Sequence, residues 1–200
     1  MYQKGERRRE EILRATLRVI GAHGADAVTH RAVAAEAGVP LSATTYYFAS
    51  KDELLEQTLL MAAREETERI EQLVLDLAPR ELSASDWAAA VASMIAGDVR
   101  EEPNRHVALF ELGLEATRTE LLRGELQRWQ EAHIRLAELG CRAVGSEEPE
   151  LDARLVVAAL TGLMLEQLAS GRDDFEDAVM RPALERLFSR LAAGERALAV

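Results

Sequence analysis

A chain of 200 residues with 48% hydrophobic and 30% charged residues has the composition of a globular protein, which excludes collagen-like and largely disordered chains. Its single cysteine, Cys141, cannot form an intrachain disulfide, and the N-terminal sequence has no apolar segment that would direct export. We therefore expect a cytoplasmic protein. No run approaches the ~20 consecutive apolar residues of a membrane helix, so we expect no membrane span.

The net charge of −11 is unevenly distributed along the chain. Residues 1–51 contain eight Lys or Arg and five Asp or Glu, a balance of +3, which leaves −14 for residues 52–200. A basic segment attracts DNA and an acidic body repels it, so this asymmetry would orient the protein on DNA. Solvated helix faces give the same pattern, and that alternative stays open.

Apolar residues recur at helical spacing along almost the whole chain, and no segment alternates as a half-buried strand would. The predicted fold class is therefore all-α. The first helix carries the apolar stripe Ile12–Ile20 and ends near Gly24, and a second, short helix runs over 29–37. We expect Thr29 to cap the second helix and Gly38 to end it in a left-handed conformation.

Pro40 makes a tight turn before a third, very short helix over 41–48. Ser50 precedes a long amphipathic helix that should end at Ala78, before Pro79. Breaks rich in Gly and Pro then separate five further predicted helices, over 85–100, 104–117, 120–144, 151–170 and 175–193. Pro182 should kink the last of these or mark its proper start.

Two short helices joined by a glycine-containing turn, with a preceding helix packed across them, are the layout of a helix-turn-helix DNA-binding module. The third helix carries hydroxyl and small apolar groups that can contact phosphates or base edges, on Ser42, Ala43, Thr45, Tyr46 and Tyr47. The alternative is that the aromatic residues fill a small core, which we expect of Phe48.

This segment resembles the DNA-binding domain of the tetracycline-repressor (TetR) family of bacterial transcriptional regulators. The resemblance covers residues 8–56 and is most specific in the Ala-Gly-Val turn at 37–39, in Tyr46-Tyr47-Phe48 and in the SKDEL sequence at 50–54. It implies an N-terminal three-helix DNA-binding domain with a helix-turn-helix, which we place at 1–50. A helical bundle for effector binding and dimerisation would follow at 51–200. The chain departs from the family pattern at Ala43, where Thr or Ser is common, and at Thr44, where a branched aliphatic residue is common.

The resemblance implies three kinds of contact with double-stranded DNA. The start of the second helix would meet the backbone through Thr29 and His30. The third helix would face the major groove with Ser42, Ala43, Thr45 and Tyr46, and phosphates would be contacted by Tyr47 and Lys51. The basic run over residues 4–9 is either an arm on the DNA backbone or a solvated terminus.

The predicted helix over 151–170 is apolar on nearly every side, so it needs partners on two faces. With the last helix it can form a four-helix interface to a symmetry mate. A monomer core would bury the same residues, but the resemblance favours a twofold homodimer, which predicts a palindromic operator. The interface would contain Leu155, Leu160, Leu163, Leu184, Leu187, Phe188 and Leu191.

The resemblance also implies a small-molecule effector that alters the spacing of the two DNA-binding domains through the long fourth helix. Bulky or flexible side chains are the candidates for its pocket wall, and polar ones for its anchors. The wall candidates are Trp87, Met94, Phe110, Trp129 and Met164, and the anchors are His106, His133, Glu111 and Gln167. We therefore expect a one-component regulator that acts as a repressor and is released from DNA by its effector.

The sequence contains no motif that would indicate an enzyme. It contains no Gly-rich phosphate loop, no nucleophile elbow and no metal-ligand spacing among its four histidines and Cys141, so we expect no cofactor and no metal site. We expect Cys141 to be a small buried hydrophobe. The alternative function is a helical adaptor that binds protein partners but not DNA.

Overall fold

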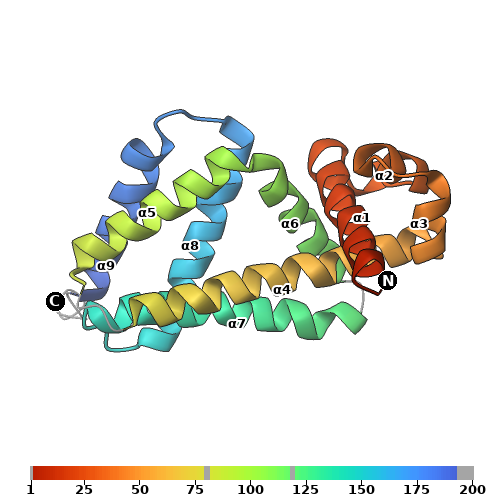
Figure 1. Cartoon of the computed structure of the whole chain (residues 1–200). Helices are drawn as coiled ribbons and strands as arrows, with labels where there is room; N and C mark the ends of the chain where they lie inside the picture. The colour runs from red at the N-terminus through yellow and green to blue at the C-terminus, as the bar shows by residue number, and fades with distance from the viewer. Residues whose placement is uncertain (1, 79–81, 118–119, 193–200) are drawn as a thin grey trace. The chain divides into compact units, whose positions relative to one another are not determined.

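The computed structural model describes residues 2–78, 82–117 and 120–192, and the side chains of 5–78, 82–117 and 123–192. Within these ranges every regular element is helical, which confirms the predicted all-α class. The elements follow one another (Figure 1) as α1 (Tyr2–His23), the 3₁₀ turn η1 (Ala25–Ala27), α2 (His30–Ala37), α3 (Leu41–Tyr47), α4 (Lys51–Leu77), α5 (Ala84–Glu101), α6 (Pro103–Ala116), α7 (Glu120–Ala143), α8 (Pro149–Ser170), the π-helical turn η2 (Glu176–Met180) and α9 (Arg181–Ala192).

Local chemistry sets several of these helix ends. The long helix α4 begins after Ser50, whose Oγ accepts a hydrogen bond from the N–H of Glu53 (3.1 Å), while the Glu53 carboxylate accepts from the N–H of Ala49 (2.6 Å). The last predicted helix is divided as expected, because α9 begins at Arg181 and places Pro182 in its first turn, where a missing N–H does no harm.

The chain forms two compact units, and the first combines Met1–Glu66 with Glu102–Trp129. In this unit α1 packs against both α2 and α6. The close approach of α6 requires Gly21, because a Cβ there would lie 2.0 Å from the carbonyl oxygen of Asn104. A buried core joins α1, α2, α4 and α6 through Ile12, Ile20, Val28, Val33, Phe48, Leu54 and Leu112. The boundary that we place after residue 50 stays a prediction.

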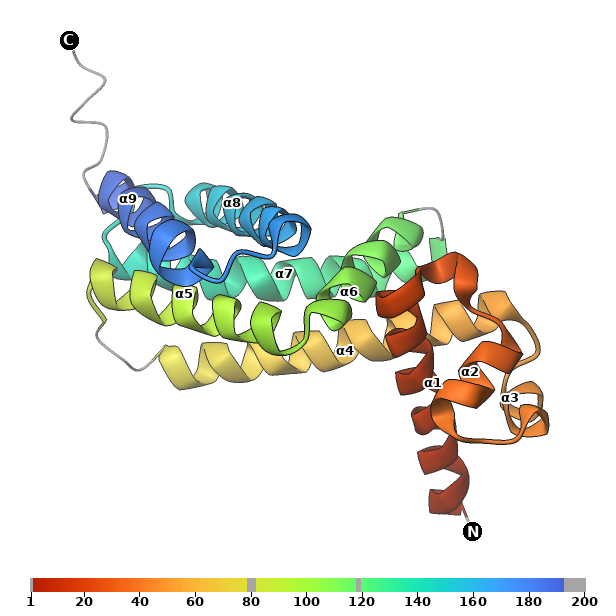
Figure 2. The same ribbon diagram turned by 90° about the horizontal axis from the view of Figure 1, so that it is seen from above.

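The second unit combines Thr67–Glu101 with Gln130–Val200, so α4 and α7 each contribute to both units. Here α5 packs along α9 and against α8, as Figure 2 shows from above. Gly140 of α7 lets two aromatic rings approach, since a Cβ there would lie 3.4 Å from both Trp87 and Phe188. The buried core of this unit contains Trp87, Ala92, Cys141, Val156, Phe175, Met180, Leu184 and Phe188.

One helix, α8, is apolar but largely uncovered. By length and composition alone α8 could cross a membrane, because an 18-residue window of it has a mean hydropathy of 1.3. Only 11% of this window is buried in the protomer. Leu151, Leu155 and Leu165 are each more than half exposed. The protomer therefore presents an apolar helix face that its own fold does not cover.

Candidate nucleic-acid interface

The turn between α2 and α3 is fixed by its own residues. The Thr29 hydroxyl accepts a hydrogen bond from the N–H of Ala32 (3.1 Å), which confirms the predicted N-cap. Gly38 ends α2 at φ 64°, in the left-handed region, and the N–H of Val39 reaches the carbonyl of Ala34 (2.9 Å). Pro40 then starts α3 with φ −59°. The two short helices are thereby held at a fixed angle.

The inner face of α3 is anchored by Thr44 and Phe48, which are 0% and 1% exposed. Phe48 is a core residue, as predicted. The Thr44 hydroxyl donates to the carbonyl of Leu41 (2.8 Å), so a buried polar group takes the place of a branched aliphatic residue without losing its hydrogen bond. Ala43 is half-buried and packs against the same core.

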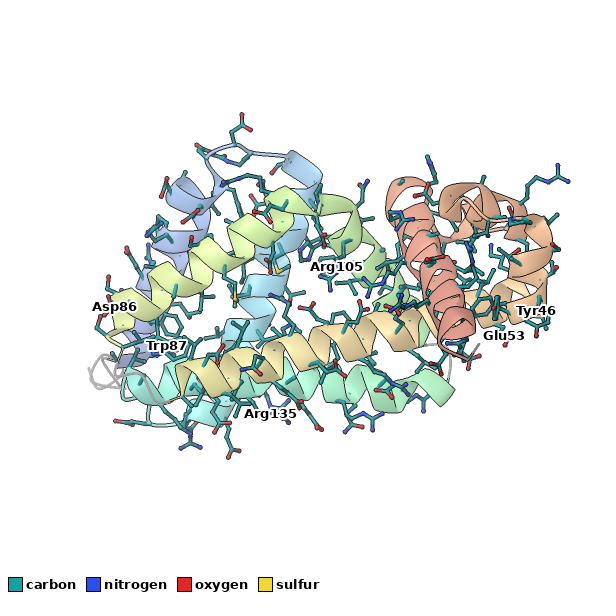
Figure 3. All side chains as sticks on the ribbon, in the orientation of Figure 1. Tyr46, Glu53, Asp86, Trp87, Arg105 and Arg135 are labelled. Atoms are coloured by element: carbon teal, nitrogen blue, oxygen red, sulfur yellow. The ribbon has the colours of Figure 1, made fainter. Side chains whose placement is uncertain are left out.

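The outer face of α3 carries the exposed side chains of Ser42, Thr45 and Tyr46. Tyr46 is 81% exposed, and Figure 3 shows its side chain pointing away from the helix. Tyr47 is half-buried against the core and packs edge to face on Tyr46, with ring centroids 5.0 Å apart. The two adjacent tyrosines therefore differ, since one is a free surface group and the other is held in place by the fold.

Residues on either side of α3 complete this surface. Thr29 is exposed at the start of α2, and the neighbouring His30 is half-buried, with an Nδ1 that has no hydrogen-bond partner within the described ranges. Lys51, in the first turn of α4, donates from Nζ to the carbonyl of Asp26 in η1 (3.2 Å). This bond places an ammonium group beside the helix-turn-helix.

The basic run over residues 4–9 lies within α1. Arg9 is anchored, because its Nη2 donates to Oε1 of Gln57 (2.6 Å) and its guanidinium lies 5.3 Å from the centre of the Phe48 ring. Arg7 is exposed. The run also lies close to α3, since a Cβ at Gly5 would be 3.5 Å from the Tyr47 hydroxyl. Arg9 was not singled out from the sequence because its partners are 39 and 48 positions away.

Ion pairs connect α6 and α7 to α4 within the first unit. Arg105 of α6 binds the buried Glu66 of α4 at 3.0 Å, and Figure 3 marks Arg105 on its helix. Glu125 of α7 is buried beside Arg128 and Arg64. Burial favours the neutral form of Glu125, but hydrogen bonds from Arg128 and Arg64 outweigh it, so the pKa of this carboxyl lies below its ordinary value.

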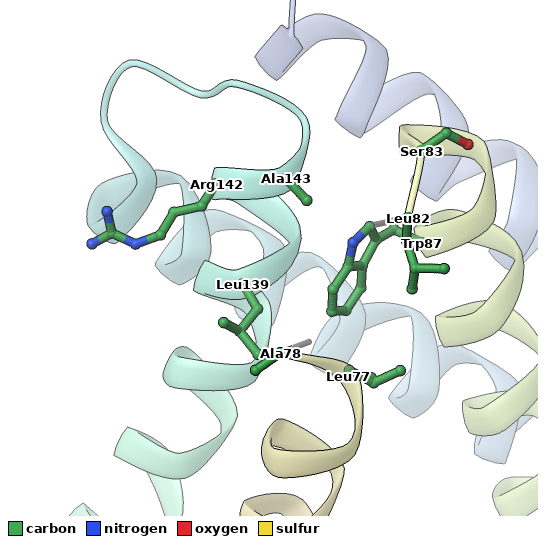
Figure 4. Close-up of a pocket in the computed structure, with 8 residues that line it drawn as sticks. All are labelled: Leu77, Ala78, Leu82, Ser83, Trp87, Leu139, Arg142 and Ala143. Carbon is green, nitrogen blue, oxygen red and sulfur yellow. The ribbon is translucent and has the colours of Figure 1, made fainter. Parts of the chain in front are cut away.

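The predicted effector-pocket residues are divided between the two units. His106, Phe110 and Trp129 lie in the first, and Trp87, Met94, His133, Met164 and Gln167 lie in the second. Trp87 lines a pocket of about 530 Å³ (Figure 4), and Gln167 bonds the backbone of Arg172, where it caps the end of α8. The further anchor candidate Glu111 accepts a hydrogen bond from the N–H of Ala25 (2.8 Å) and so joins α6 to η1.

The predicted dimer-interface residues also differ, in how far the protomer buries them. Leu184 and Phe188, at 1% and 2% exposure, are buried in the protomer's own core, because the face of α9 that carries them packs on α5. Their side chains are therefore not available to a partner, and we remove Leu184 and Phe188 from the predicted interface. Leu155 is exposed, and the others, half-buried, are Leu160, Leu163, Leu187 and Leu191.

The described part of the chain contains no group of three or more His, Cys, Asp or Glu side chains that could hold a metal ion. Cys141 is buried in the second unit, as expected. Burial, followed by the charges of Asp152 and Glu138, raises the pKa of its thiol to about 11.

Comparisons with known proteins agree with this geometry. Residues 12–58 match the family model described as bacterial regulatory proteins, tetR family, and residues 82–191 match the model described as tetracyclin repressor-like, C-terminal domain. Over 77 residues the chain is 40% identical to the HTH-type transcriptional regulator PksA of Bacillus subtilis (strain 168), a match that spans 38% of this chain and 38% of PksA.

Solved structures are similar over nearly the whole chain. The multidrug binding protein EbrR in complex with imidazole is 31% identical with a TM-score of 0.65, covering 90% of this chain and 94% of that one. EbrR has also been solved with ethidium and with proflavin. The TetR-family member SCO1917 from Streptomyces coelicolor A3 is 28% identical with a TM-score of 0.66, covering 92% of this chain and 97% of that one.

Proposed function

Because this chain belongs to the TetR family of bacterial transcriptional regulators, we propose that it is a cytoplasmic repressor that binds a palindromic operator as a homodimer and is released by a small-molecule effector. Members of the family are DNA-binding transcription factors and not enzymes. The observation that carries the proposal is the two-sided construction of α3. Its inner face is buried through Thr44, while Ser42, Thr45 and Tyr46 remain exposed on the outer face.

The exposed residues of α3 are suited to base contacts and the surrounding ones to the DNA backbone. Ser42 and Thr45 present hydroxyls that can bond base edges, and the Thr45 methyl can touch a thymine methyl. Tyr47 and Lys51 lie at the end of α3 and the start of α4, with positions fixed by the core and by the bond to Asp26. A hydroxyl and an ammonium held in this way are suited to phosphates, which set register without reading sequence.

The uncovered face of α8 supports the homodimer. Its exposed apolar and small residues recur at spacings of four and three, as in a helix-packing seam, at Leu151, Leu155, Ala158, Gly162 and Leu165. We propose that a twofold mate covers this face, with contributions from the half-buried Leu187 and Leu191 of α9. A symmetric interface of this kind presents two equal DNA-binding domains, which is the reason to expect a palindromic operator.

The effector is supported by the similarity to EbrR, whose structures contain small molecules. The region that matches the C-terminal family model, 82–191, is the helical body that would bind it. An effector releases DNA only through its difference in affinity between two conformations of the protein, and that difference would be carried by the helical body.

Fluorescence anisotropy with labelled duplexes over a series of salt concentrations tests DNA binding. A DNA-binding protein loses affinity as salt rises, because cations condensed on the phosphates are released on binding. Tyr47→Ala and Lys51→Ala should weaken binding to every sequence, and Lys51→Ala should also reduce the salt dependence by about one counterion. Thr45→Ala should instead change the base preference.

The exposed residue Ala35 of α2 offers a control, because Ala35→Ser lies outside the proposed contacts and should leave binding unchanged. Equal effects of all three variants on every duplex would contradict the assigned roles. Absence of DNA binding at low salt would favour the alternative, a helical adaptor for protein partners.

Sedimentation velocity tests the dimer. Leu155→Arg places a charge on the uncovered face of α8 and should shift the protein toward monomer, because a buried unpaired charge is costly. Leu75→Arg is the matched control, since Leu75 of α4 is 68% exposed but lies outside that face. A dimer unaffected by Leu155→Arg would place the interface elsewhere.

A further inference from the structure

The 3₁₀ turn η1, between α1 and α2, is bonded by side chains from two helices that are distant in the sequence. On one side, the Glu111 carboxylate of α6 accepts a hydrogen bond from the N–H of Ala25 (2.8 Å). On the other side, the carbonyl of the next residue, Asp26, accepts a hydrogen bond from Nζ of Lys51 in α4 (3.2 Å). A turn of three residues therefore connects α6 to an ammonium group beside the helix-turn-helix.

The helix that carries Glu111 is a firm support for this bond. In the first unit α6 packs along α1, as Figures 1 and 2 show, and Gly21 of α1 lets the two backbones approach closely. The neighbours of Glu111 along α6, Leu109 and Leu112, are 5% and 1% exposed. The Glu111 carboxylate therefore projects toward η1 from a helix whose position the core fixes.

The backbone of η1 can pass the position of Glu111 on to Asp26. The turn is closed by a bond from the N–H of Ala27 to the carbonyl of Gly24 (3.1 Å), so its residues move together. Ala25 is half-buried, and without Glu111 its N–H would lose the acceptor that it has in the fold. The start of η1 would then turn toward water, and the Asp26 carbonyl would move with it.

The bond to Asp26 matters because a lysine is a flexible ligand. A free lysine side chain loses rotamer freedom when it binds a phosphate, and a lysine that the protein already orders loses less. The Asp26 carbonyl occupies one of the three donors of the ammonium group and leaves two for a phosphate. The carbonyl is uncharged, so it orients Lys51 without neutralising it.

We propose that Glu111 is a positioning residue for DNA binding, because it holds η1 and η1 holds the Lys51 ammonium where it contacts a phosphate. The inference rests on the proposed function, which assigns that phosphate contact to Lys51. Glu111 acts through Lys51, since a carboxylate is itself repelled by a phosphate. Its charge alone predicts the opposite effect, because removing an acidic group should tighten the binding of DNA.

Fluorescence anisotropy with the full-length protein and a labelled duplex of unselected sequence at low salt tests the inference. Glu111→Ala should raise Kd about threefold, the ratio expected when one side chain is no longer ordered before binding. Glu111→Gln keeps an oxygen that can accept from Ala25 and removes the charge, so it should bind at least as tightly as the parent. Glu101→Ala removes an exposed acid at the end of α5 and is the matched control, which should not raise Kd.

The Lys51→Ala background separates positioning from a general loss of stability. In that background Glu111→Ala should cause no further weakening, because no ammonium group remains to be positioned, whereas a disturbed fold would weaken both backgrounds alike. Three results overturn the inference: Glu111→Ala that binds as tightly as the parent, equal weakening in both backgrounds, or Glu111→Gln that binds as weakly as Glu111→Ala. A parent that does not bind the duplex overturns the proposed function and this inference with it, so the two failures are distinguishable.

Discussion

Substituting Gly21 tests the packing of α6 on α1, which ties α6 to the helix-turn-helix within the first unit. Gly21 lies in the last turn of α1, and an alanine Cβ there would be 2.0 Å from the carbonyl oxygen of Asn104 and 2.6 Å from its carbonyl carbon. Both atoms belong to the backbone of α6. No rotation of a side chain can relieve the overlap, so Gly21→Ala must push the two helices apart.

Two opposing effects set the magnitude. Alanine stabilises a helix interior relative to glycine by about 1 kcal/mol. Overpacking costs about 1–3 kcal/mol. The distance of 2.0 Å from the alanine Cβ to the Asn104 oxygen is much shorter than the ~3.5 Å of a normal contact, so we expect a cost at or beyond the upper end of that range. The net loss in the free energy of unfolding should be about 2 kcal/mol, a fall of about 4–8 °C in Tm for a chain of this length.

Gly97→Ala is the matched control, because a Cβ at this position of α5 meets nothing within 4 Å. It should raise the free energy of unfolding by about 1 kcal/mol. Urea denaturation followed by circular dichroism measures both variants, at one fixed protomer concentration because dimer stability depends on concentration. A Gly21→Ala protein as stable as its parent, alongside the expected gain for Gly97→Ala, would refute the close packing of α1 on α6.

Further predictions concern a cap, a buried carboxylate and a thiol. Thr29→Ala should lower the free energy of unfolding by about 1 kcal/mol in the same urea titration, because it removes the α2 cap, and Thr29→Ser should restore most of the loss. Burial disfavours the charged form of Glu125, but hydrogen bonds from Arg128 and Arg64 lower its pKa in the folded state. The ionised carboxylate therefore stabilises the fold at pH values above the pKa that Glu125 has in the unfolded chain. This contribution is lost as the pH falls through the lower pKa of the folded state. Melting curves at a series of pH values should therefore show a shallower acid decline for Glu125→Gln, and an unchanged slope would contradict this. Burial, aided by two nearby carboxylates, raises the pKa of Cys141 to about 11, so at about pH 8 a thiol reagent should react with Cys141 only after unfolding, and rapid reaction of the native protein would count against it.

The elements of the helix-turn-helix were predictable because their causes are local. The Thr29 cap acts on a residue three positions away, and the left-handed turn at Gly38 needs only a residue without a Cβ. Phe48 was predicted as a core aromatic residue of a small domain, and it is 1% exposed. The same local reasoning could not decide between Thr44 as a core or a surface residue, because its burial depends on packing against α2, where its hydroxyl lies 3.4 Å from the carbonyl oxygen of His30.

The candidate site was less predictable where contacts join distant parts of the chain. Arg9 belongs by sequence to a basic run, but Gln57, 48 positions later, holds its guanidinium. The effector-pocket candidates were chosen by residue type, and residue type does not determine which compact unit each one joins. Of these candidates Trp87 lines a pocket of about 530 Å³ in the second unit, and Gly140 of α7 leaves room for its ring.

The sequence by itself determined that the chain is helical and, to within about two residues, where most of its helices begin and end, since apolar spacing, caps and prolines act within a few residues. The tertiary structure alone decided which apolar side chains stay uncovered. Leu155 and Leu184 are both leucines that we predict in the dimer interface, yet α5 covers Leu184 in the protomer while Leu155 remains 54% exposed. Burial is a property of pairs of helices, and helical periodicity records one helix at a time.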